Sequence, residues 1–445
     1  MKRFGTFTIV FALIICGCNG NAIKQESRQN ENNSGGVNII VIDQEEQAKA
    51  DKLKQEAEAV GLLAKAREEI ELGDYESALE KVEGVIKNYP QMAESYCLRG
   101  EITCQIDDEE KMFKFRPDPE KMRRGIKDFN KAVEIDQKMA RAFMKRGQVK
   151  WYIKDLFGSL IDLSRSIELD PKYSKAHQCI ACVKFELGHP LDAIEDLNKA
   201  AKLSSIDPDI LLTRGAIFAR INKLDDATKD FTKSIRLNPN DPEAYKQRAS
   251  VRARLQDLNN AVKDLDKAIS IDPKDVDSYI IRANIHLNLG DNNKAVADFS
   301  EAVKLEPANF NNYYQRGTVF FRLKNLKACL KDYDKAISLN PVYALLYEAR
   351  AYVRQEMKDF KGAMEDYSQV IKINPRNIHA GINRGYLKAL LGDKKGAIED
   401  YNNLFRLDAV LQIFLKFTSL VEKINGEEES EKETPQEEEQ DKEED

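Results

Sequence analysis

A ten-residue pattern that returns at a fixed spacing constrains this chain more than any other feature of its sequence. Residues 332–341 read DYDKAISLNP, with close copies at 128–137, 162–171, 230–239, 264–273, 298–307 and 366–375 and weaker ones at 196–205 and 400–409. The leading Asp of each copy lies 34 residues before the next. A fixed short period indicates an array of identical units rather than the two or three ordinary domains that 445 residues would otherwise form.

Each unit is predicted to be a pair of helices. In residues 310–343, FNNYYQRGTVFFRLK and NLKACLKDYDKAISLNP are helical stretches separated by a polar turn at Lys324-Asn325. Apolar residues recur in both stretches at the three- and four-residue steps of a helix face. Asn340-Pro341 ends the second stretch, because Pro cannot continue a helix interior. One such hairpin cannot bury its apolar face alone, so we expect the units to stack on a continuous core.

Two positions in every unit carry a small residue. The eighth residue is Gly or Ala in all ten units, and the twentieth is Ala, Gly, Ser or Cys. Small residues on facing helices let the two backbones approach closely. Since a Gly in the middle of a helix costs about 1 kcal/mol relative to Ala, its recurrence indicates a packing requirement.

This pattern of small, aromatic and proline positions resembles the tetratricopeptide repeat family. The resemblance covers ten units, at 59–92, 93–139, 140–173, 174–207, 208–241, 242–275, 276–309, 310–343, 344–377 and 378–411. The second unit carries 13 extra residues around 107–119, and Tyr mostly replaces the Trp that is usual at the fourth position. The resemblance implies an all-α fold, a right-handed superhelical solenoid of about ten helix–turn–helix hairpins. A helix over 412–425 is expected to cap the last repeat.

The amino-terminal residues have the features of an export signal. Residues 1–3 (MKR) are positively charged, and the apolar run at 4–15 is too short to span a bilayer, which needs about 20 residues. The run ends in ICGC at 15–18, which resembles a bacterial lipobox with Cys18 as the lipid-modified residue. An ordinary signal peptide with two incidental cysteines is the alternative. The resemblance implies a lipoprotein signal peptide over 1–17. It also implies attachment to the extracytoplasmic face of a bacterial membrane, the outer membrane if the host has two.

The segments that flank the repeats differ from them in composition. Residues 18–42 are rich in Asn, Ser and Gly and are expected to form a flexible tether, and the charged residues 43–58 a polar leading helix. Residues 426–445 carry 12 acidic residues and 2 lysines, so we expect an acidic, disordered tail. The rest of the chain is close to neutral, and no long basic patch indicates nucleic-acid binding.

Arginine occupies the seventh position of eight units, and an aspartate begins the repeated pattern of each of these units. The arginines are Arg99, Arg146, Arg214, Arg248, Arg282, Arg316, Arg350 and Arg384, and the aspartates are Asp128, Asp162, Asp230, Asp264, Asp298, Asp332, Asp366 and Asp400. Because the acids recur with the arginines, we interpret them as structural pairs rather than as a ladder for a polyanion. The sequence leaves open whether a pair forms within one unit or between two. In the fourth unit Ile180 replaces the arginine, which leaves one Asp without its expected partner.

Little in the sequence indicates catalysis or metal binding. Cys179 and Cys182 form a C-x-x-C inside a predicted helix, without a second pair at zinc spacing. The four histidines are far apart, and no hydrolase or phosphate-binding motif is present. We therefore expect no enzyme activity, no cofactor and no metal. A redox- or metal-responsive ligand-binding protein that uses Cys179 and Cys182 is the alternative.

The family resemblance also implies where a partner binds. In the family, positions 2, 5, 9 and 12–13 of each first helix face a concave groove that holds peptides or protein segments. Here these positions provide a basic patch and a run of mostly aromatic residues, namely Arg220, Lys246 and Arg254, and then Tyr314, Thr318, Phe321, Tyr352, Ile382 and Tyr386. Packing of the rings against adjacent first helices is the alternative. The resulting expectation is a non-enzymatic, membrane-anchored scaffold of the bacterial envelope that binds envelope proteins or peptides, with no oligomeric state indicated.

Overall fold

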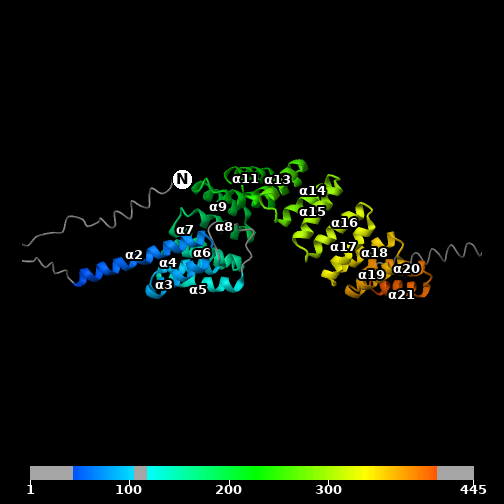
Figure 1. Cartoon of the computed structure of the whole chain (residues 1–445), viewed down its shortest axis with the longest axis horizontal. Helices are drawn as coiled ribbons and strands as arrows, with labels where there is room; N and C mark the ends of the chain where they lie inside the picture. The colour runs from blue at the N-terminus through cyan, green and yellow to red at the C-terminus, as the bar shows by residue number, and fades with distance from the viewer. Residues whose placement is uncertain (1–43, 105–117, 408–445) are drawn as a thin grey trace, which may run out of the picture. The chain divides into compact units, whose positions relative to one another are not determined.

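The computed structural model describes residues 44–104 and 118–407, which form 20 α-helices and no β-strand (Figure 1). The predicted signal peptide, tether, capping helix and acidic tail lie outside these residues, as does most of the insertion at 107–119. Among the described helices, none combines the length and the hydropathy that a membrane span requires. The chain divides into two compact units, residues 1–64 and 65–445, and all of the described helices except α2 belong to the second unit.

The predicted polar leading helix is the beginning of a longer helix. Helix α2 runs from Gln44 to Glu71 without a break. Strong helix formers, chiefly Ala, Lys, Glu and Gln, continue across the expected boundary at residue 58, and no proline interrupts them. The helix therefore extends into the range predicted for the first repeat, and the boundary between the two compact units falls within it.

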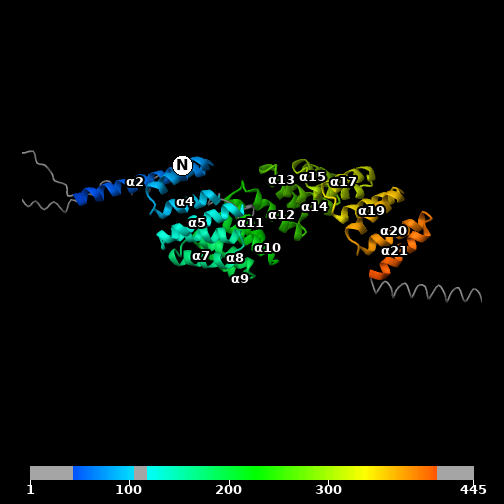
Figure 2. The ribbon, with the colours of Figure 1, turned by 90° about the horizontal axis from the view of Figure 1, so that it is seen from below.

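The remaining helices alternate as the first and second helices of hairpins. The first helices are α4 (Ala93–Cys104), α6 (Ala140–Tyr152), α8 (Ser174–Glu186), α10 (Pro208–Arg220), α12 (Pro242–Arg254), α14 (Val276–Asn288), α16 (Phe310–Arg322), α18 (Ala344–Glu356) and α20 (Ile378–Leu390). The second helices are α3 (Tyr75–Asn88), α5 (Pro119–Ile135), α7 (Leu156–Leu169), α9 (Pro190–Leu203), α11 (Leu224–Leu237), α13 (Leu258–Ile271), α15 (Asn292–Leu305), α17 (Leu326–Leu339), α19 (Phe360–Ile373) and α21 (Lys394–Leu407). Each first helix packs against the second helix of its own hairpin and against that of the preceding hairpin (Figure 2). This consecutive packing confirms the predicted all-α solenoid.

The small residues at the eighth position lie where the two helices of a hairpin are closest. A Cβ atom added to Gly215 on α10 would lie 2.7 Å from the ring of Phe231 on α11. A Cβ atom added to Gly317 on α16 would lie 2.7 Å from the ring of Tyr333 on α17. Both rings are buried. In these two repeats an aromatic ring of the facing helix occupies the space of the missing side chain. The facing side chain of Gly147 is Leu163 instead, and alanine is accommodated beside Phe299 and Tyr367 at Ala283 and Ala351.

In nine of the hairpin turns, one residue has a left-handed backbone conformation. It is the fifteenth residue of its repeat, and the positions are Gly73, Lys154, Gly188, Asn222, Gln256, Gly290, Lys324, Lys358 and Gly392. In the eighth repeat, the amide of Lys324 donates to Phe321 O at 2.9 Å and the amide of Asn325 donates to Phe320 O at 2.9 Å. These bonds satisfy the last carbonyl groups of the first helix, as in a Schellman motif.

Substitutions at this turn position should change stability in opposite directions. We expect Gly290→Ala to destabilise the protein by about 1 kcal/mol, because an L residue is strained in the left-handed conformation. A Cβ atom at Gly290 meets no other atom within 4 Å, so the effect is confined to the backbone. Lys358→Gly should stabilise by a smaller amount, since glycine also gains freedom in the unfolded chain. Urea denaturation followed by circular dichroism measures both changes, and destabilisation by both would contradict this explanation.

The eight arginines of the seventh position pair with the aspartates of their own repeats. Arg316 donates from Nε at 2.8 Å and from Nη2 at 2.7 Å to the two carboxylate oxygens of Asp332. The same two-pronged geometry recurs in the other seven pairs. The question that the sequence left open is answered, because each pair joins the two helices of one hairpin.

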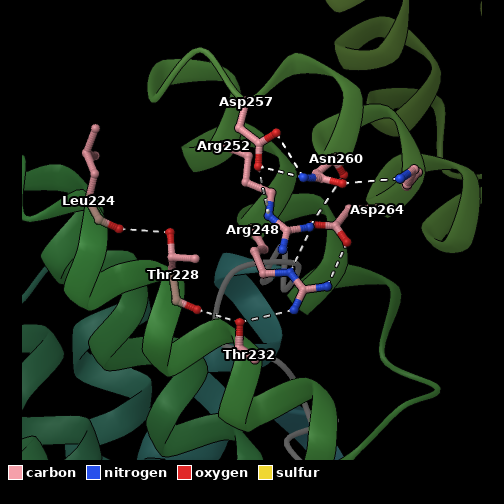
Figure 3. A network of polar contacts seen from close by, with 9 residues as sticks. Leu224, Thr228, Thr232, Arg248, Arg252, Asp257, Asn260 and Asp264 are labelled. Atoms are coloured by element: carbon pink, nitrogen blue, oxygen red, sulfur yellow. Dashed lines mark hydrogen bonds and ion pairs between the residues drawn. The ribbon is translucent and has the colours of Figure 1, made fainter.

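A third nitrogen of the arginine reaches the preceding repeat. Nη1 of Arg248 donates to Thr232 Oγ1 on α11 at 3.1 Å (Figure 3). Seven of the arginines make this contact, and the acceptors are Asn130, Asn198, Thr232, Asp266, Ser300, Asp334 and Ser368. The guanidinium also lies near the ring at the fourth position, with Arg248 Cζ 5.7 Å from the Tyr245 centroid. Each of these arginines therefore stabilises its own hairpin and its junction with the preceding one.

The fourth repeat holds its aspartate with a different cation. Ile180 occupies the arginine position, but Lys184, one helical turn later, donates to Asp196 at 2.6 Å. The expectation that this aspartate lacks a partner is therefore wrong. The same later position supplies a second cation elsewhere, since Arg252 Nη1 lies 2.7 Å from the Asp264 carboxylate (Figure 3).

Candidate protein-binding groove on the first helices

The first helices of the last two repeats expose aromatic and aliphatic side chains. Tyr352 on α18 is 53% exposed and Tyr386 on α20 is 56% exposed, and each is the ninth residue of its repeat. Ile382 lies one turn before Tyr386 and is also exposed. Phe321, at the end of α16, meets the Tyr352 ring edge-on with 5.4 Å between centroids. We call Phe321, Tyr352, Ile382 and Tyr386 the aromatic strip.

Two other residues predicted to line the groove pack within the solenoid instead. Tyr314 is half-buried and stacks on Tyr333 of α17, with 5.7 Å between centroids, and burial raises the pKa of its hydroxyl. The hydroxyl of Thr318 donates to Tyr314 O at 2.9 Å and lies 3.2 Å from the Tyr333 hydroxyl. Tyr314 therefore packs on the second helix of its own hairpin. The alternative that the sequence left open, packing of rings against adjacent first helices, describes the contact between Phe321 on α16 and Tyr352 on α18.

The predicted basic patch is smaller than the sequence indicated, because Lys246 does not present its charge to solvent. Its side chain is buried, and Nζ lies 2.9 Å from Glu243 and 3.2 Å from Asp275. Burial by itself lowers the pKa of Lys246, but the two carboxylates outweigh burial and raise it. The charge of Lys246 is balanced by Glu243 and Asp275 within the fold. We therefore no longer count this residue among those that line the groove.

The other two residues of the predicted patch remain at the surface. Arg220 is exposed, with its guanidinium 5.7 Å from the centroid of the Phe185 ring. Arg254 is exposed too, but it donates to Ala219 O at 2.7 Å and to Asn222 Oδ1 at 2.9 Å. Both arginines thus contact the preceding repeat. The positive surface that they form is therefore weaker than the sequence predicted.

In repeats two to four, the face of the first helices that corresponds to the aromatic strip is buried rather than exposed. The ninth residues there include Gln148 and Cys182, and both are buried. Lys145 on α6 is buried 4.0 Å from Glu101 on α4, and Arg141 donates to the same carboxylate at 2.7 Å. Helix α6 also packs directly on both α4 and α8. This closure was not predicted from the sequence, although opposite charges at facing positions of neighbouring repeats were a signal for it.

A separate surface depression of about 660 Å³ lies between α3, α4 and α5. Glu76 and Glu83 line one side, and Lys121, Arg124 and Lys127 line another. Its walls carry charges of both signs and no residue of the predicted groove. The depression therefore does not extend the aromatic strip.

The C-x-x-C pair lies inside α8 and contributes to the core. Cys179 and Cys182 are buried in a cluster with Met144, Trp151 and Val183. Burial raises the pKa of the Cys182 thiol well above its usual range. Redox and metal chemistry use the thiolate, which such an environment disfavours. Among residues 44–104 and 118–407, no group of three or more His, Cys, Asp or Glu side chains is arranged to hold a metal ion.

Comparisons with known proteins find a family match for part of the repeat array. Models of the tetratricopeptide repeat family match residues 215–285, 283–324, 310–343 and 344–377, and the last two ranges coincide with two predicted repeats. No curated protein matches the sequence.

Several solved structures resemble parts of the chain at low identity. The C-terminal part of a TPR repeat-containing protein from Cytophaga hutchinsonii is 19% identical, with a TM-score of 0.47, over 52% of this chain and 94% of that one. A tetratricopeptide repeat protein from Parabacteroides merdae is 18% identical, with a TM-score of 0.37, over 66% and 98%. Yeast Tom70 is 15% identical, with a TM-score of 0.36, over 85% and 100%.

The family models agree with the helix pairs and their 34-residue spacing. Proteins of this family are generally non-catalytic, and the fold suggests a scaffold for protein–protein interactions. Residues 215–377 of this chain therefore match the tetratricopeptide repeat family.

Proposed function

We propose that this protein is a membrane-anchored scaffold of the bacterial envelope that binds a segment of a partner protein along the aromatic strip. The exposure of Tyr352 and Tyr386 carries the proposal, since the same repeat position is buried at Gln148 and Cys182. A tyrosine offers a large rigid apolar area and a hydroxyl group for a hydrogen bond, which is why interfaces concentrate their binding energy on such residues. A partner segment with apolar side chains would cover the strip.

Positive charge at one end of the strip favours an acidic residue in that segment. Arg322 is exposed at the end of α16, and Lys324 Nζ lies 5.3 Å from the centroid of the Phe321 ring. Arg220 and Arg254 extend the positive surface only weakly, because both contact the preceding repeat. We therefore expect apolar contacts to supply most of the affinity and charge to set the direction of the segment.

Removing the two exposed rings tests the binding site. The double variant Tyr352→Ala, Tyr386→Ala should recover partner proteins from membranes at least about tenfold less well, because interface anchors each contribute about 2 kcal/mol or more. Both side chains are more than half exposed, so circular dichroism and thermal melting should match the wild type. Val342→Ala, at an exposed apolar residue in the turn after α17, is the matched control and should leave recovery unchanged. Full recovery by a folded double variant would remove the strip from consideration.

The membrane anchor is tested separately at the amino terminus. If Cys18 carries the acyl chains, Cys18→Ala should release the protein from the membrane fraction or leave it unprocessed, because more than one acyl chain is needed for stable anchoring. Cys16→Ala is the matched control, two residues away, and should remain anchored. Cell fractionation and intact mass measure both results. A Cys18→Ala protein with the wild-type mature mass and membrane attachment would contradict the anchor without affecting the aromatic strip.

A further inference from the structure

Helix α17 of the eighth repeat presents a row of lysines to solvent. Lys327, Lys331 and Lys335 lie one helical turn apart on one face of the helix, and all three are exposed. Within the part of the chain that the structure describes, no acidic side chain lies within ion-pair distance of any of them. The exposed acid of α17, Asp334, is paired with Arg350 of α18 at 2.7 Å. We call the three lysines the basic row.

Exposed lysines on two other second helices pair with an acid three residues away. Lys229 on α11 lies 3.2 Å from Asp226, and Lys304 on α15 lies 3.1 Å from Glu301. Among the described residues, the basic row has no such pair. Like charges four residues apart destabilise a helix, so an anionic group bound over the row would relieve this repulsion.

The second helices before and after α17 do not supply the missing negative charge. Outside the buried arginine–aspartate pairs, α15, α19 and their capping residues carry four lysines and five acids, namely Lys294, Lys304, Lys361 and Lys372, and Asp291, Glu301, Glu306, Asp359 and Glu365. Their charges therefore nearly cancel. Arg322 at the end of α16 and Lys324 in the turn before α17 are also exposed and add two cations. The eighth repeat thus carries a local excess of positive charge.

We propose that the acidic segment 426–445 binds along the basic row of the same molecule. The segment contains 12 acidic residues and 2 lysines, a net charge of −10, and no Leu, Ile, Val or Phe. Its binding therefore depends on charge rather than on apolar burial. Each exposed ion pair is weak, but many acids can exchange over a few fixed cations, and attachment to the same chain raises the effective concentration of the segment.

The acidic segment can reach the basic row. Helices α17 to α21 pack consecutively, and the axes of packed helices are about 8–10 Å apart, so α17 lies within roughly 40 Å of α21. The 18 residues from 408 to 425 would cover about 27 Å as a helix. The 20 residues of the segment would cover up to about 65 Å when extended. The row is therefore within reach even if the connecting residues form the expected capping helix.

The surface of α17 favours this segment over an anionic membrane. Binding of a helix to a membrane interface depends on apolar side chains as well as on cations. Helix α17 exposes no large apolar side chain. An anionic membrane would also repel an acidic segment on the same chain. The segment, by contrast, is present once for every basic row.

Binding of the segment would regulate the aromatic strip, a consequence that rests on the proposed function. Arg322 and Lys324 form the positive end of the strip and directly precede the basic row. The bound segment would lower the positive potential there and weaken the attraction of an acidic residue in a partner. Glu→Gln at the ten glutamates of residues 426–445, the neutral-segment variant, removes this effect. It should raise recovery of partner proteins from membranes at least about fivefold, and unchanged recovery would contradict the regulation.

Carbodiimide cross-linking of the full chain tests the binding of the segment without any partner, so its result is separable from that of the aromatic strip. The reagent joins a lysine amine to a carboxylate in contact with it, and mass spectrometry identifies the joined residues. In low salt we expect cross-links from residues 426–445 to the basic row. They should be lost at about 1 M salt, where the Debye length is about 3 Å.

Matched lysines show whether attachment alone explains the cross-links. Lys361 and Lys395 occupy the same position in repeats nine and ten as Lys327 in repeat eight, and they are closer to the segment in sequence. Lys327 should nevertheless be cross-linked at least about fivefold more often. In an equal mixture of isotopically light and heavy chains, the cross-links should join residues of one copy. Equal cross-linking of the three lysines, or cross-links between copies, would overturn the proposal.

A labelled peptide of residues 426–445 tests whether the basic row is already occupied. By fluorescence anisotropy in low salt, the peptide should bind the neutral-segment variant at least about tenfold more tightly than the wild type, whose own segment competes. Adding Lys331→Glu, Lys335→Glu to that variant should abolish binding. Adding Lys263→Glu, Lys267→Glu, at the same two positions of α13, is the matched control and should not. Equal affinity for the wild type and the neutral-segment variant, or equal effects of the two lysine changes, would overturn the proposal. So would binding of the basic row to phosphatidylglycerol vesicles without cross-links to the segment.

Discussion

Replacing Arg316 with alanine should destabilise the eighth repeat by about 3–5 kcal/mol, the loss typical of breaking a buried ion pair at one partner. The variant leaves the Asp332 carboxylate buried after losing hydrogen bonds of 2.8 and 2.7 Å. The position one turn later, which carries a second cation in several repeats, is Phe320 here and cannot replace the arginine. Urea denaturation followed by circular dichroism measures the loss.

Arg248→Ala is the matched control, because its aspartate keeps another cation. Arg252 Nη1 remains 2.7 Å from Asp264, and a charged hydrogen bond contributes about 1.5–3 kcal/mol. The decrease in the free energy of unfolding for Arg248→Ala should therefore be about half of that for Arg316→Ala. Adding Asp332→Ala to Arg316→Ala should recover part of the loss, since no unpaired carboxylate is then buried. Equal losses at the two arginines, or no recovery in the double variant, would contradict this role.

Gly215→Ala should destabilise the fifth repeat by about 1–3 kcal/mol, even though alanine is the better helix former. The added Cβ atom would lie 2.7 Å from the buried ring of Phe231, so the two helices must move apart or the ring must shift. Gly84→Ala in α3 is the control, because its Cβ atom would meet nothing within 4 Å. That variant should instead stabilise the protein by up to about 1 kcal/mol.

A second substitution shows whether the ring causes the loss. In two other repeats an alanine at this position faces a leucine, in the pairs Ala181–Leu197 and Ala249–Leu265. Phe231→Leu combined with Gly215→Ala should therefore be more stable than the sum of the two single changes predicts. Thermal melts of the four proteins measure this coupling, and strictly additive effects would mean that the ring is not the obstacle.

The period and residue types were enough to predict most of the fold. The 34-residue spacing predicted helix pairs, and two predicted repeats coincide with the family matches at 310–343 and 344–377. The recurrence of Gly indicated a close helix contact, which the structure assigns to rings such as Phe231. These features were predictable because they depend on contacts within one hairpin, where helix geometry relates sequence spacing directly to a common face.

Contacts between repeats were predicted less well. Lys246, at the fifth position of its repeat, and Tyr352, at the ninth, were both predicted to line the groove, yet the first is buried between Glu243 and Asp275 and the second is more than half exposed. The difference depends on how closely successive first helices approach each other. The residue type at a single position does not determine that distance. The pair between Lys184 and Asp196 was also missed, although it lies within one hairpin, because its cation comes from the position one turn after the recurring arginine.

Site-specific photo-crosslinking in cells tests the central proposal, that the exposed first helices of the last repeats hold a partner protein. A photoreactive residue would replace Tyr352, Tyr386 or, as the control, Lys361, which is exposed on the second helix of the same repeat as Tyr352. We predict covalent protein adducts at residues 352 and 386 and none at residue 361. No adduct at either tyrosine position, or equal adducts at all three, would contradict binding along the aromatic strip.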